Sequence, residues 1–301
     1  MTLPTDWEGF PQDLEPIAPR VGPFPQRPFL EALWGHRQDQ GSELHIEASE
    51  SGAAAVVLSN GRVTFAGQSD LTDYHSPLGP DGAEALAAAV RHFRATPFTL
   101  DSLPEEATRP IMDALDAAGI DGAVTEDETA AVLGLPATYE DWLGALGKKQ
   151  RHEVRRKRRR FAEEFGAIRI ERHAGDAIET FCTMHRLSLG DKGKFMTEGM
   201  EEYFTQLLLT AAASIHLLMC DGVARAAAFG FETEAGYFYY NSAYDPAAAM
   251  ASPGVVLFSS MIETEIERGA SVFDFLKGDE PYKFRHGAEP RQLFAITGTT
   301  P

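Results

Sequence analysis

The alternation of apolar and polar residues predicts short strands joined by tight turns in both halves of the chain. In the first half, two strand-like runs flank Asn60-Gly61 in "AAAVVLSNGRVTFAG", and this dipeptide favours a type I′ hairpin turn. In the second half, "IHLLMCDGVARAAAFGF" has the same organisation around Asp221-Gly222. Segments with helical periodicity follow both hairpins. We therefore expect an α/β fold built on a mixed sheet (α+β).

The order of these elements repeats along the chain. After the first hairpin come a helix-like "AEALAAAVRHF", a strand-like "FTLDSL" and a second helix-like "PIMDALDAAG". After the second come a strand-like "GYFYYNSAYDP", a helix-like "GVVLFSSMIETEIERG", a strand-like "SVFDFLKG" and a short helical "EPYKFRHG". The repeat lies in element order and not in sequence. It predicts two related halves, although so common an order can also arise twice by chance.

A further helix is predicted between the two halves. Five apolar residues form one narrow stripe at helical spacing, and basic residues occupy the other faces. We expect a packed helix over residues 139–166, "YEDWLGALGKKQRHEVRRKRRRFAEEFG", with Gly166 as its C-cap. The stripe consists of Trp142, Leu146, Val154, Phe161 and Phe165.

Charge is distributed very unevenly. The net charge is −18, yet nine of the fourteen residues from Lys148 to Phe161 are Lys or Arg, against one acid, Glu153. Residues 1–147 contain no Lys and seven Arg against 24 acids, and so acidic a surface repels nucleic acid and anionic lipid. One interpretation of the basic helix is a solvated face paired with acidic neighbours. Ion pairs within the helix cannot balance nine bases with one acid, which weakens this interpretation. The alternative is that the basic face binds an anion, and a small phosphorylated ligand fits so acidic a protein better than a nucleic acid does.

Composition is typical of a globular protein of 301 residues, with 44% hydrophobic and 24% charged residues. Two cysteines, Cys182 and Cys220, are too few for a disulfide framework and suggest a reducing compartment. The N-terminus resembles no secretory signal, and the longest apolar stretch, from Leu207, is too short to span a bilayer. We therefore expect a cytoplasmic protein. The nine histidines have no metal-ligand spacing, so no metal site is expected.

The motifs of the second half resemble the CelD-like acetyltransferase domain of the GNAT superfamily, which is related to the Fem aminoacyltransferases. They are, in order, "RHEVRRKRRRFAEEFG", "DGVARAAAFGF", "YFYYNSAYDP" and "SPGVVLFSSMIETEIERGASVFDFLKGDEPYKFRHG". The resemblance is strongest over residues 140–297, and "DFLKGDEPYK" is its most specific part. "FPQRPFLEALW" and "LTDYHSPL" resemble the family's opening domain more weakly.

The resemblance implies tandem GNAT-like domains, residues 1–138 and 139–301, of which the first is degenerate. It also implies transfer of an acetyl or other acyl group from a coenzyme A thioester to an amine or hydroxyl, without a metal. Such a transfer needs positioning, a group that polarises the electrophile, and a route for protons.

The candidate cofactor element starts at a predicted helix. Ser252 is a plausible N-cap before Pro253-Gly254, and free N–H groups at a helix start suit a pyrophosphate. The resemblance places the coenzyme A pyrophosphate here and the pantetheine beside the strand from Tyr239 to Tyr244. An ordinary capped helix is the alternative, and the chain lacks the Q/R-x-x-G-x-G/A loop of typical GNAT enzymes. The cofactor-binding candidates are Tyr244, Ser252, Pro253, Gly254 and Val255.

The candidate catalytic residues gather in "FDFLKGDEPYKF", at a strand end and the turn that follows it. The resemblance makes Tyr282 the acid that protonates the leaving thiolate. Asp274 and Glu280 are candidate bases; alternatively they are structural partners of Lys277, Lys283 or Arg285. Lys283 completes the catalytic candidates.

The basic helix supplies phosphate-binding candidates, because the equivalent helix of related Fem enzymes approaches phosphates and Arg suits bidentate contacts. These candidates are Arg151, Arg155, Arg158 and Arg159, with Lys277 added from the catalytic stretch. Cys182 and His185 lie at i,i+3 on a predicted helix, where a buried thiol is more common than a nucleophile. The cationic "GDKGKF" either lines the acceptor site or is a surface loop.

The leading hypothesis is thus an acyltransferase that uses acetyl-coenzyme A or another acyl-coenzyme A. Its acceptor would be a small polar metabolite or envelope precursor, phosphorylated or not. A Fem-like aminoacyltransferase that uses aminoacyl-tRNA is the alternative, against which the acidic surface argues. A catalytically inactive GNAT-like binding protein and a nucleic-acid-binding protein are the hypotheses from other classes. We expect no stable nucleic-acid partner and no membrane span.

Overall fold

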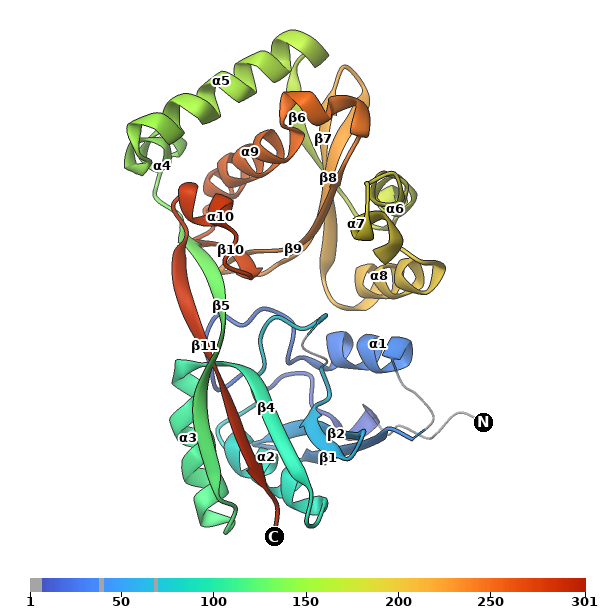
Figure 1. The fold of residues 1–301 in the computed structure, drawn as a ribbon, viewed down its shortest axis with the longest axis vertical. Helices are drawn as coiled ribbons and strands as arrows, with labels where there is room; N and C mark the ends of the chain where they lie inside the picture. The colour runs from blue at the N-terminus through green and yellow to red at the C-terminus, as the bar shows by residue number, and fades with distance from the viewer. Residues whose placement is uncertain (1–6, 38–40, 68–69) are drawn as a thin grey trace. The chain divides into compact units, whose positions relative to one another are not determined.

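The structure is a computed structural model that describes residues 7–37, 41–67 and 70–301 (Figure 1). It divides into two compact units, one of Met1–Ala130 with Arg291–Pro301 and one of Ala131–Pro290. The second unit is therefore inserted, in sequence, before the last strand of the first. The domains predicted from the sequence, 1–138 and 139–301, had assigned that strand to the second domain.

The first unit is a mixed sheet with two helices that follow its strands. Its strand order is β1-β2-β3-β4-β11-β5, with β3 and β4 parallel and the β1–β2, β2–β3 and β4–β11 pairs antiparallel. The elements are η1 (Trp7–Gly9), α1 (Arg27–Arg37), β1 (Glu43–Ala48), β2 (Ala53–Ser59), β3 (Arg62–Phe65), α2 (Gly82–His92), β4 (Pro97–Pro104), α3 (Glu105–Ala117), β5 (Gly122–Gly134) and β11 (Glu289–Thr299).

The second unit contains the basic segment and most of the predicted site residues. Its elements are α4 (Tyr139–Ala145), α5 (Lys148–Phe165), β6 (Ile168–His173), η2 (Gly175–Ala177), α6 (Ile178–Arg186), α7 (Asp191–Phe195), α8 (Glu198–Thr210), β7 (Ala213–Cys220), β8 (Val223–Glu232), β9 (Gly236–Tyr244), η3 (Pro246–Ala251), α9 (Pro253–Glu267), β10 (Val272–Lys277) and α10 (Pro281–Arg285).

Helices cover both faces of the second unit's sheet. Strands β6, β7, β8 and β9 are antiparallel neighbours, and β10 joins β9 in parallel. Figure 1 shows α5 and α9 on one side of these strands and α6, α7 and α8 on the other. Tyr237 and Tyr239 of β9 pack in one core with residues of α9 such as Leu257. On the other face, the ring centres of Phe204 and Tyr240 lie 5.7 Å apart, so each face has its own apolar layer.

The predicted hairpins and the repeat of element order are present. Asn60 and Gly61 both have positive φ (52° and 72°), as do Asp221 and Gly222 (46° and 79°), which a type I′ turn requires. In each unit an antiparallel hairpin precedes a helix, a strand parallel to the second hairpin strand, and a further helix. In the second unit this hairpin is β8–β9 and not the predicted one at Asp221-Gly222, which joins β7 to β8. These segments are β2-β3-α2-β4-α3 in the first unit and β8-β9-α9-β10-α10 in the second. The mixed α/β class predicted from the sequence is confirmed.

The prediction of one helix over residues 139–166 is wrong in one respect, because two helices occupy this stretch. Leu146 has an extended backbone (ψ 148°) and Gly147 begins α5 as its N-cap. Gly144 and Gly147 lower the helix propensity at this point. The apolar stripe still faces the core, since Trp142, Leu146, Val154 and Phe161 are buried. Gly166 ends α5 with φ 95°, as predicted.

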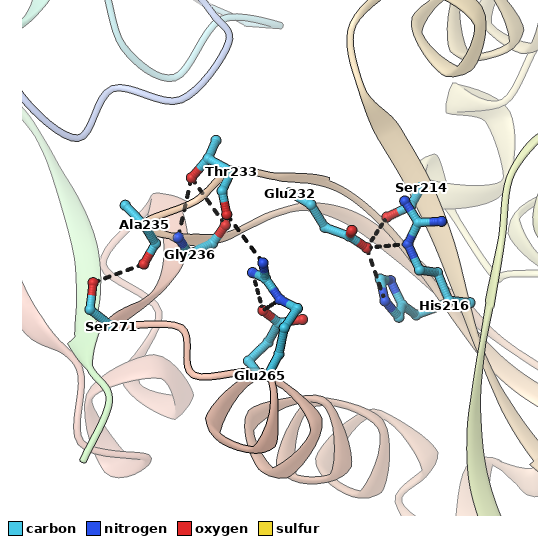
Figure 2. A network of polar contacts seen from close by, with 10 residues as sticks. Ser214, His216, Glu232, Thr233, Ala235, Gly236, Glu265 and Ser271 are labelled. Atoms are coloured by element: carbon cyan, nitrogen blue, oxygen red, sulfur yellow. Dashed lines mark hydrogen bonds and ion pairs between the residues drawn. The ribbon is translucent and has the colours of Figure 1, made fainter. Parts of the chain in front are cut away.

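A polar network lies across β6, β7 and β8, with an ion pair at the end of α9 nearby (Figure 2). The Glu232 carboxylate accepts hydrogen bonds from Arg172 Nε (2.7 Å) and from the Ser214 hydroxyl (3.0 Å). His216 Nε2 lies 3.4 Å from the same oxygen, and Glu265 pairs with Arg268 at 2.6 Å. Burial lowers the pKa of His216 to about 4, although the Glu232 charge opposes this shift.

We predict that His216 makes stability depend on pH. Unfolded His has a pKa of about 6.5, so between about pH 6.5 and 4 the unfolded chain binds a proton that folded His216 does not. The free energy of unfolding should therefore fall as the pH falls through this window, by at most about 1.4 kcal/mol per pH unit. His216→Gln keeps an N–H donor but does not titrate, and it should flatten the slope. Urea unfolding at about pH 7.5, 6 and 5 measures both proteins; equal slopes would contradict the prediction.

Candidate active site

The parallel strands β9 and β10 are paired only at their beginnings. The register joins Gly236 to Val272, Tyr237 to Phe273 and Phe238 to Asp274, and no later pair exists within the described residues. From Tyr239 to Tyr244, β9 is therefore paired on one side only, with β8. Backbone N–H and C=O groups along this edge can pair with an extended ligand that contains amides.

A buried carboxylate holds β10 in the bend that accompanies this divergence. Leu276 has a left-handed backbone (φ 62°), which is rare for a branched residue. Its N–H donates to Asp274 Oδ1 at 2.8 Å, and Asp274 is fully buried. The first unit has a similar arrangement, in which Ser102 (φ 54°) donates its N–H to the Asp127 carboxylate. These contacts are those of a residue that fixes the strand end, while the predicted role of Asp274 as a base stays a prediction.

Lys283 holds the turn after β10 together. Its ammonium donates to the carbonyls of Leu276, Lys277 and Gly278 at 3.3, 2.5 and 3.2 Å. It also pairs with Glu280 Oε2 at 3.0 Å, and its side chain is buried. A cation enclosed by carbonyl oxygens is well placed to fix the chain between β10 and α10.

Tyr282 lies on α10 with its ring against two aromatic residues. It packs 5.8 Å from Phe258 of α9 and 6.4 Å from Phe275 of β10, and 38% of the residue is exposed. Burial, with a contribution from the Glu280 charge, raises the pKa of Tyr282 to about 12. The phenol is therefore protonated at neutral pH and can act as a donor.

His286 and Gln150 also position α10, and sequence reasoning missed both. His286 is buried, and its Nδ1 lies 2.6 Å from the carbonyl oxygen of Tyr282. Gln150 Nε2, in the first turn of α5, lies 3.1 Å from His286 Nε2, and Trp142 Nε1 donates to the His286 carbonyl at 3.0 Å. Since Nδ1 faces a carbonyl, it carries the proton, and Nε2 accepts from Gln150. The nine histidines had no spacing that would single out His286.

The predicted cofactor residues lie at the start of α9. Ser252 occupies the N-cap position, but with a left-handed backbone (φ 64°) and without a side-chain cap. The N–H groups of Val255 and Val256 both donate to the Ser252 carbonyl, and Pro253 has none. The Gly254 N–H is thus the remaining donor of this turn in the described structure. A Cβ at Gly254 would meet nothing within 4 Å, so no protein atom covers the backbone here.

Tyr244 ends β9 beside the loop that leads to this helix. It is 37% exposed, and Lys192 Nζ lies 5.8 Å from the centre of its ring. Lys192 belongs to the "GDKGKF" segment, which forms the short helix α7 instead of a plain loop. The segment thus contacts the end of β9.

Most cations of the basic helix have acidic partners. Arg155 pairs with Glu140 of α4 at 2.7 Å, and Arg159 with Glu163 at 3.8 Å. Arg158 is more enclosed than Arg155 and Arg159: it contacts Glu263 of α9 and the Tyr139 hydroxyl, each at 2.5 Å. Glu140 and Glu163 lie just outside the fourteen-residue stretch and Glu263 lies far from it in sequence, which is why the composition of the stretch did not indicate them.

The beginning of the basic helix differs from the rest. Arg151 donates to the Gly144 carbonyl at 2.9 Å and so closes the end of α4. Lys148 and Lys149 make no ion pair within the described residues, and both lie in the first turn of α5. Positive charge there adds to the positive end of the helix dipole. This turn is therefore the most anion-attracting part of the helix.

A thiol nucleophile and a metal site find no support in the part of the chain that the structure describes. Cys182 is buried, and burial raises the pKa of its thiol to about 11, which disfavours a nucleophilic role. Within residues 7–37, 41–67 and 70–301, no three His, Cys, Asp or Glu residues are grouped as metal ligands would be. Over the same residues, no helix has both the length and the apolar character needed to cross a bilayer.

Residues 148–284 match the family model of the acetyltransferase (GNAT) domain. This segment runs from the first residue of α5 into α10 and so contains β9, α9 and β10, whereas α4 and His286 lie just outside it. Over these residues the chain therefore carries a GNAT-type acetyltransferase domain, as its sequence motifs indicated. No curated protein matches the chain in sequence.

Solved structures share the fold at low sequence identity. A conserved protein of unknown function from Bacteroides thetaiotaomicron is 11% identical (TM-score 0.60; 90% of this chain and 89% of that chain covered). The C-terminal domain of a putative lysylphosphatidylglycerol synthetase from Agrobacterium fabrum is 12% identical (TM-score 0.57; 89% of this chain and 91% of that chain covered). FemX is 12% identical (TM-score 0.58; 84% of this chain and 87% of that chain covered). The chain thus shares its fold with FemX and with the synthetase domain.

The contacts of Arg158 and Arg155 predict different consequences for stability. Arg158→Leu should lower the free energy of unfolding by about 1–3 kcal/mol, because it leaves the half-buried Glu263 carboxylate and Tyr139 hydroxyl without their partner. Arg155→Leu, the matched control on the same helix, should change it by less than about 0.5 kcal/mol, since its pair with Glu140 is exposed. Urea unfolding compares the two variants. Equal losses would show that Arg158 has no special structural role.

Proposed function

We propose that this protein transfers an acetyl or other acyl group from a coenzyme A thioester to an amine, or less readily a hydroxyl, of a small polar acceptor. The observation that carries the proposal is the divergence of β9 and β10 inside a GNAT-type domain. The single-sided edge of β9 offers peptide groups to the amides of pantetheine. The Gly254 N–H, at the start of α9, offers a donor to the pyrophosphate.

The reaction needs a proton donor for the leaving group. An amine attacks the thioester carbonyl carbon, the resulting tetrahedral intermediate collapses, and the C–S bond breaks to release coenzyme A as a thiolate. Tyr282, protonated at neutral pH and fixed through its carbonyl by His286, is the proposed donor to that sulfur. The proton that the amine loses goes to a base, for which Glu280 is the more accessible candidate and Asp274 the fully buried one.

The acceptor is proposed to be small and polar, with a phosphate as one option. The first turn of α5, with Lys148, Lys149 and Gln150, is connected to α10 through His286 and has cations without acidic partners in the described structure. It supports a phosphate site better than Arg158 does. Arg151, Arg155, Arg159 and Lys277 stay candidates.

Aminoacyl transfer from tRNA is the alternative. The likeness to FemX and to the synthetase domain lies in the fold, at 12% identity each, and carries no substrate with it. A protein with net charge −18 would also have to bind a polyanion. We therefore favour an acyl-coenzyme A donor.

Gly254 provides the first test. Gly254→Asp places a carboxylate where the pyrophosphate is proposed to bind and should weaken acetyl-coenzyme A binding at least about tenfold, roughly 1.4 kcal/mol. Gly254→Ala, the matched control, adds a methyl group into open space and should have a small effect. Titration calorimetry measures both. Unchanged affinity in the Asp variant would remove the pyrophosphate assignment.

Tyr282 provides the second test. Tyr282→Phe removes the hydroxyl but keeps the ring contacts with Phe258 and Phe275, so acetyl-coenzyme A should bind as in the wild type. Turnover with an amine acceptor should fall by about 10²-fold, the lower end for general acid catalysis, because thiolates leave well even unprotonated. Steady-state kinetics at saturating donor measure the effect. A turnover equal to that of the wild type would assign Tyr282 to packing.

A further inference from the structure

One polar side chain marks the unpaired segment of β9 on the face opposite Tyr282. Asn241 lies three residues beyond Phe238, the last residue of β9 that pairs with β10. It follows an irregularity in the β8–β9 register, where Phe229 pairs with Asn241 and Gly230 with Tyr239, so that Tyr240 is the extra residue. Its side chain contacts α6, whereas Tyr282 packs on α9, and these helices cover opposite faces of the sheet (Figure 1).

The orientation of the Asn241 amide is set by a buried histidine. His185 of α6 is 1% exposed, and its Nε2 lies 3.0 Å from Asn241 Oδ1. Because an amide oxygen can only accept, Nε2 carries the proton and donates it. The His185 ring is itself fixed between Phe181 and Phe195, with ring centres 5.8 and 5.5 Å away. The Asn241 oxygen is therefore held toward α6.

This contact leaves the Asn241 Nδ2 group as a donor. Its two N–H groups have no hydrogen-bond partner among the described residues, and the side chain is half-buried. Half-buried amide donors usually have a partner, either water or a ligand. A ligand that lies along the open edge of β9 passes within reach of a side chain that stands on that edge.

We propose that Asn241 donates a hydrogen bond from Nδ2 to the carbonyl oxygen of the bound acyl thioester, and that His185 is the positioning residue that keeps the amide in this orientation. The inference rests on the proposed function and assigns the group that polarises the electrophile. When the amine attacks, negative charge develops on this oxygen, and a fixed N–H donor stabilises it. Tyr282 then acts on the sulfur from the other face of the sheet.

Calorimetry with acetyl-coenzyme A and with free coenzyme A tests the contact directly, because only the thioester has the acyl carbonyl. Wild type should bind acetyl-coenzyme A about three- to tenfold more tightly than coenzyme A, as one neutral hydrogen bond allows. Asn241→Ala should abolish this preference, because it weakens the binding of acetyl-coenzyme A and leaves the binding of free coenzyme A unchanged. His185→Leu should do the same, because the amide is then free to turn.

His185→Gln is the matched control for the positioning role. The Gln side chain can place an N–H near the position of His185 Nε2, so this variant should keep the preference for acetyl-coenzyme A that His185→Leu loses. If His185 serves only in packing, its substitution should instead lower the melting temperature and weaken the binding of both ligands equally. That result would overturn the inference. A wild-type protein without any preference, or an Asn241→Ala variant that keeps it, would also overturn it and leave the proposed function standing. Binding of neither ligand by wild type would remove both.

Discussion

The second unit is organised around two parallel strands that separate after three paired residues. Parallel neighbours normally stay hydrogen-bonded along their shared length, so the separation must be held by other contacts. Asp274 supplies one by binding the N–H of Leu276 in its left-handed conformation, and Lys283 supplies another by gathering three carbonyls of the following turn. The most polar buried residues of the catalytic stretch thus maintain the shape of the site, while the half-exposed Tyr282 is left for chemistry.

The charge contrast that dominates the sequence has a largely local explanation. Glu140, Glu163 and Glu263 lie outside the basic stretch but neutralise Arg155, Arg159 and Arg158. Glu263 is more than a hundred positions away in the chain, and only the packing of α5 near α9 brings it to Arg158. The residual cationic character is concentrated at one end of the helix, in its first turn. A stretch rich in one charge is therefore best judged after its neighbours in space are known.

Local patterns predicted much of the fold, because hairpin turns and amphipathic helices are specified by adjacent residues. Asn60-Gly61, Asp221-Gly222 and Gly166 adopt the backbone conformations that their residue types favour. The break at Gly147 was missed because the apolar stripe continues in phase across it. Contacts between distant segments had no sequence signal: neither the Gln150–His286 contact nor the His185–Asn241 contact follows from spacing. The candidate site could therefore be located to a strand end, but its supporting residues could not.

The return of the chain to the first unit has a consequence for how the protein is made. Strand β11 lies between β4 and β5, with register pairs from Leu293–Pro104 to Thr299–Pro97. A ribosome releases these residues only after the inserted unit, so the N-terminal unit lacks an internal strand of its sheet until residues 131–290 have been made. The inserted unit, Ala131–Pro290, has all its residues earlier. The N-terminal unit is thus synthesised first but completes its sheet after the inserted unit has been made. Until then, the edges of β4 and β5 that later pair with β11 are open to incorrect pairing.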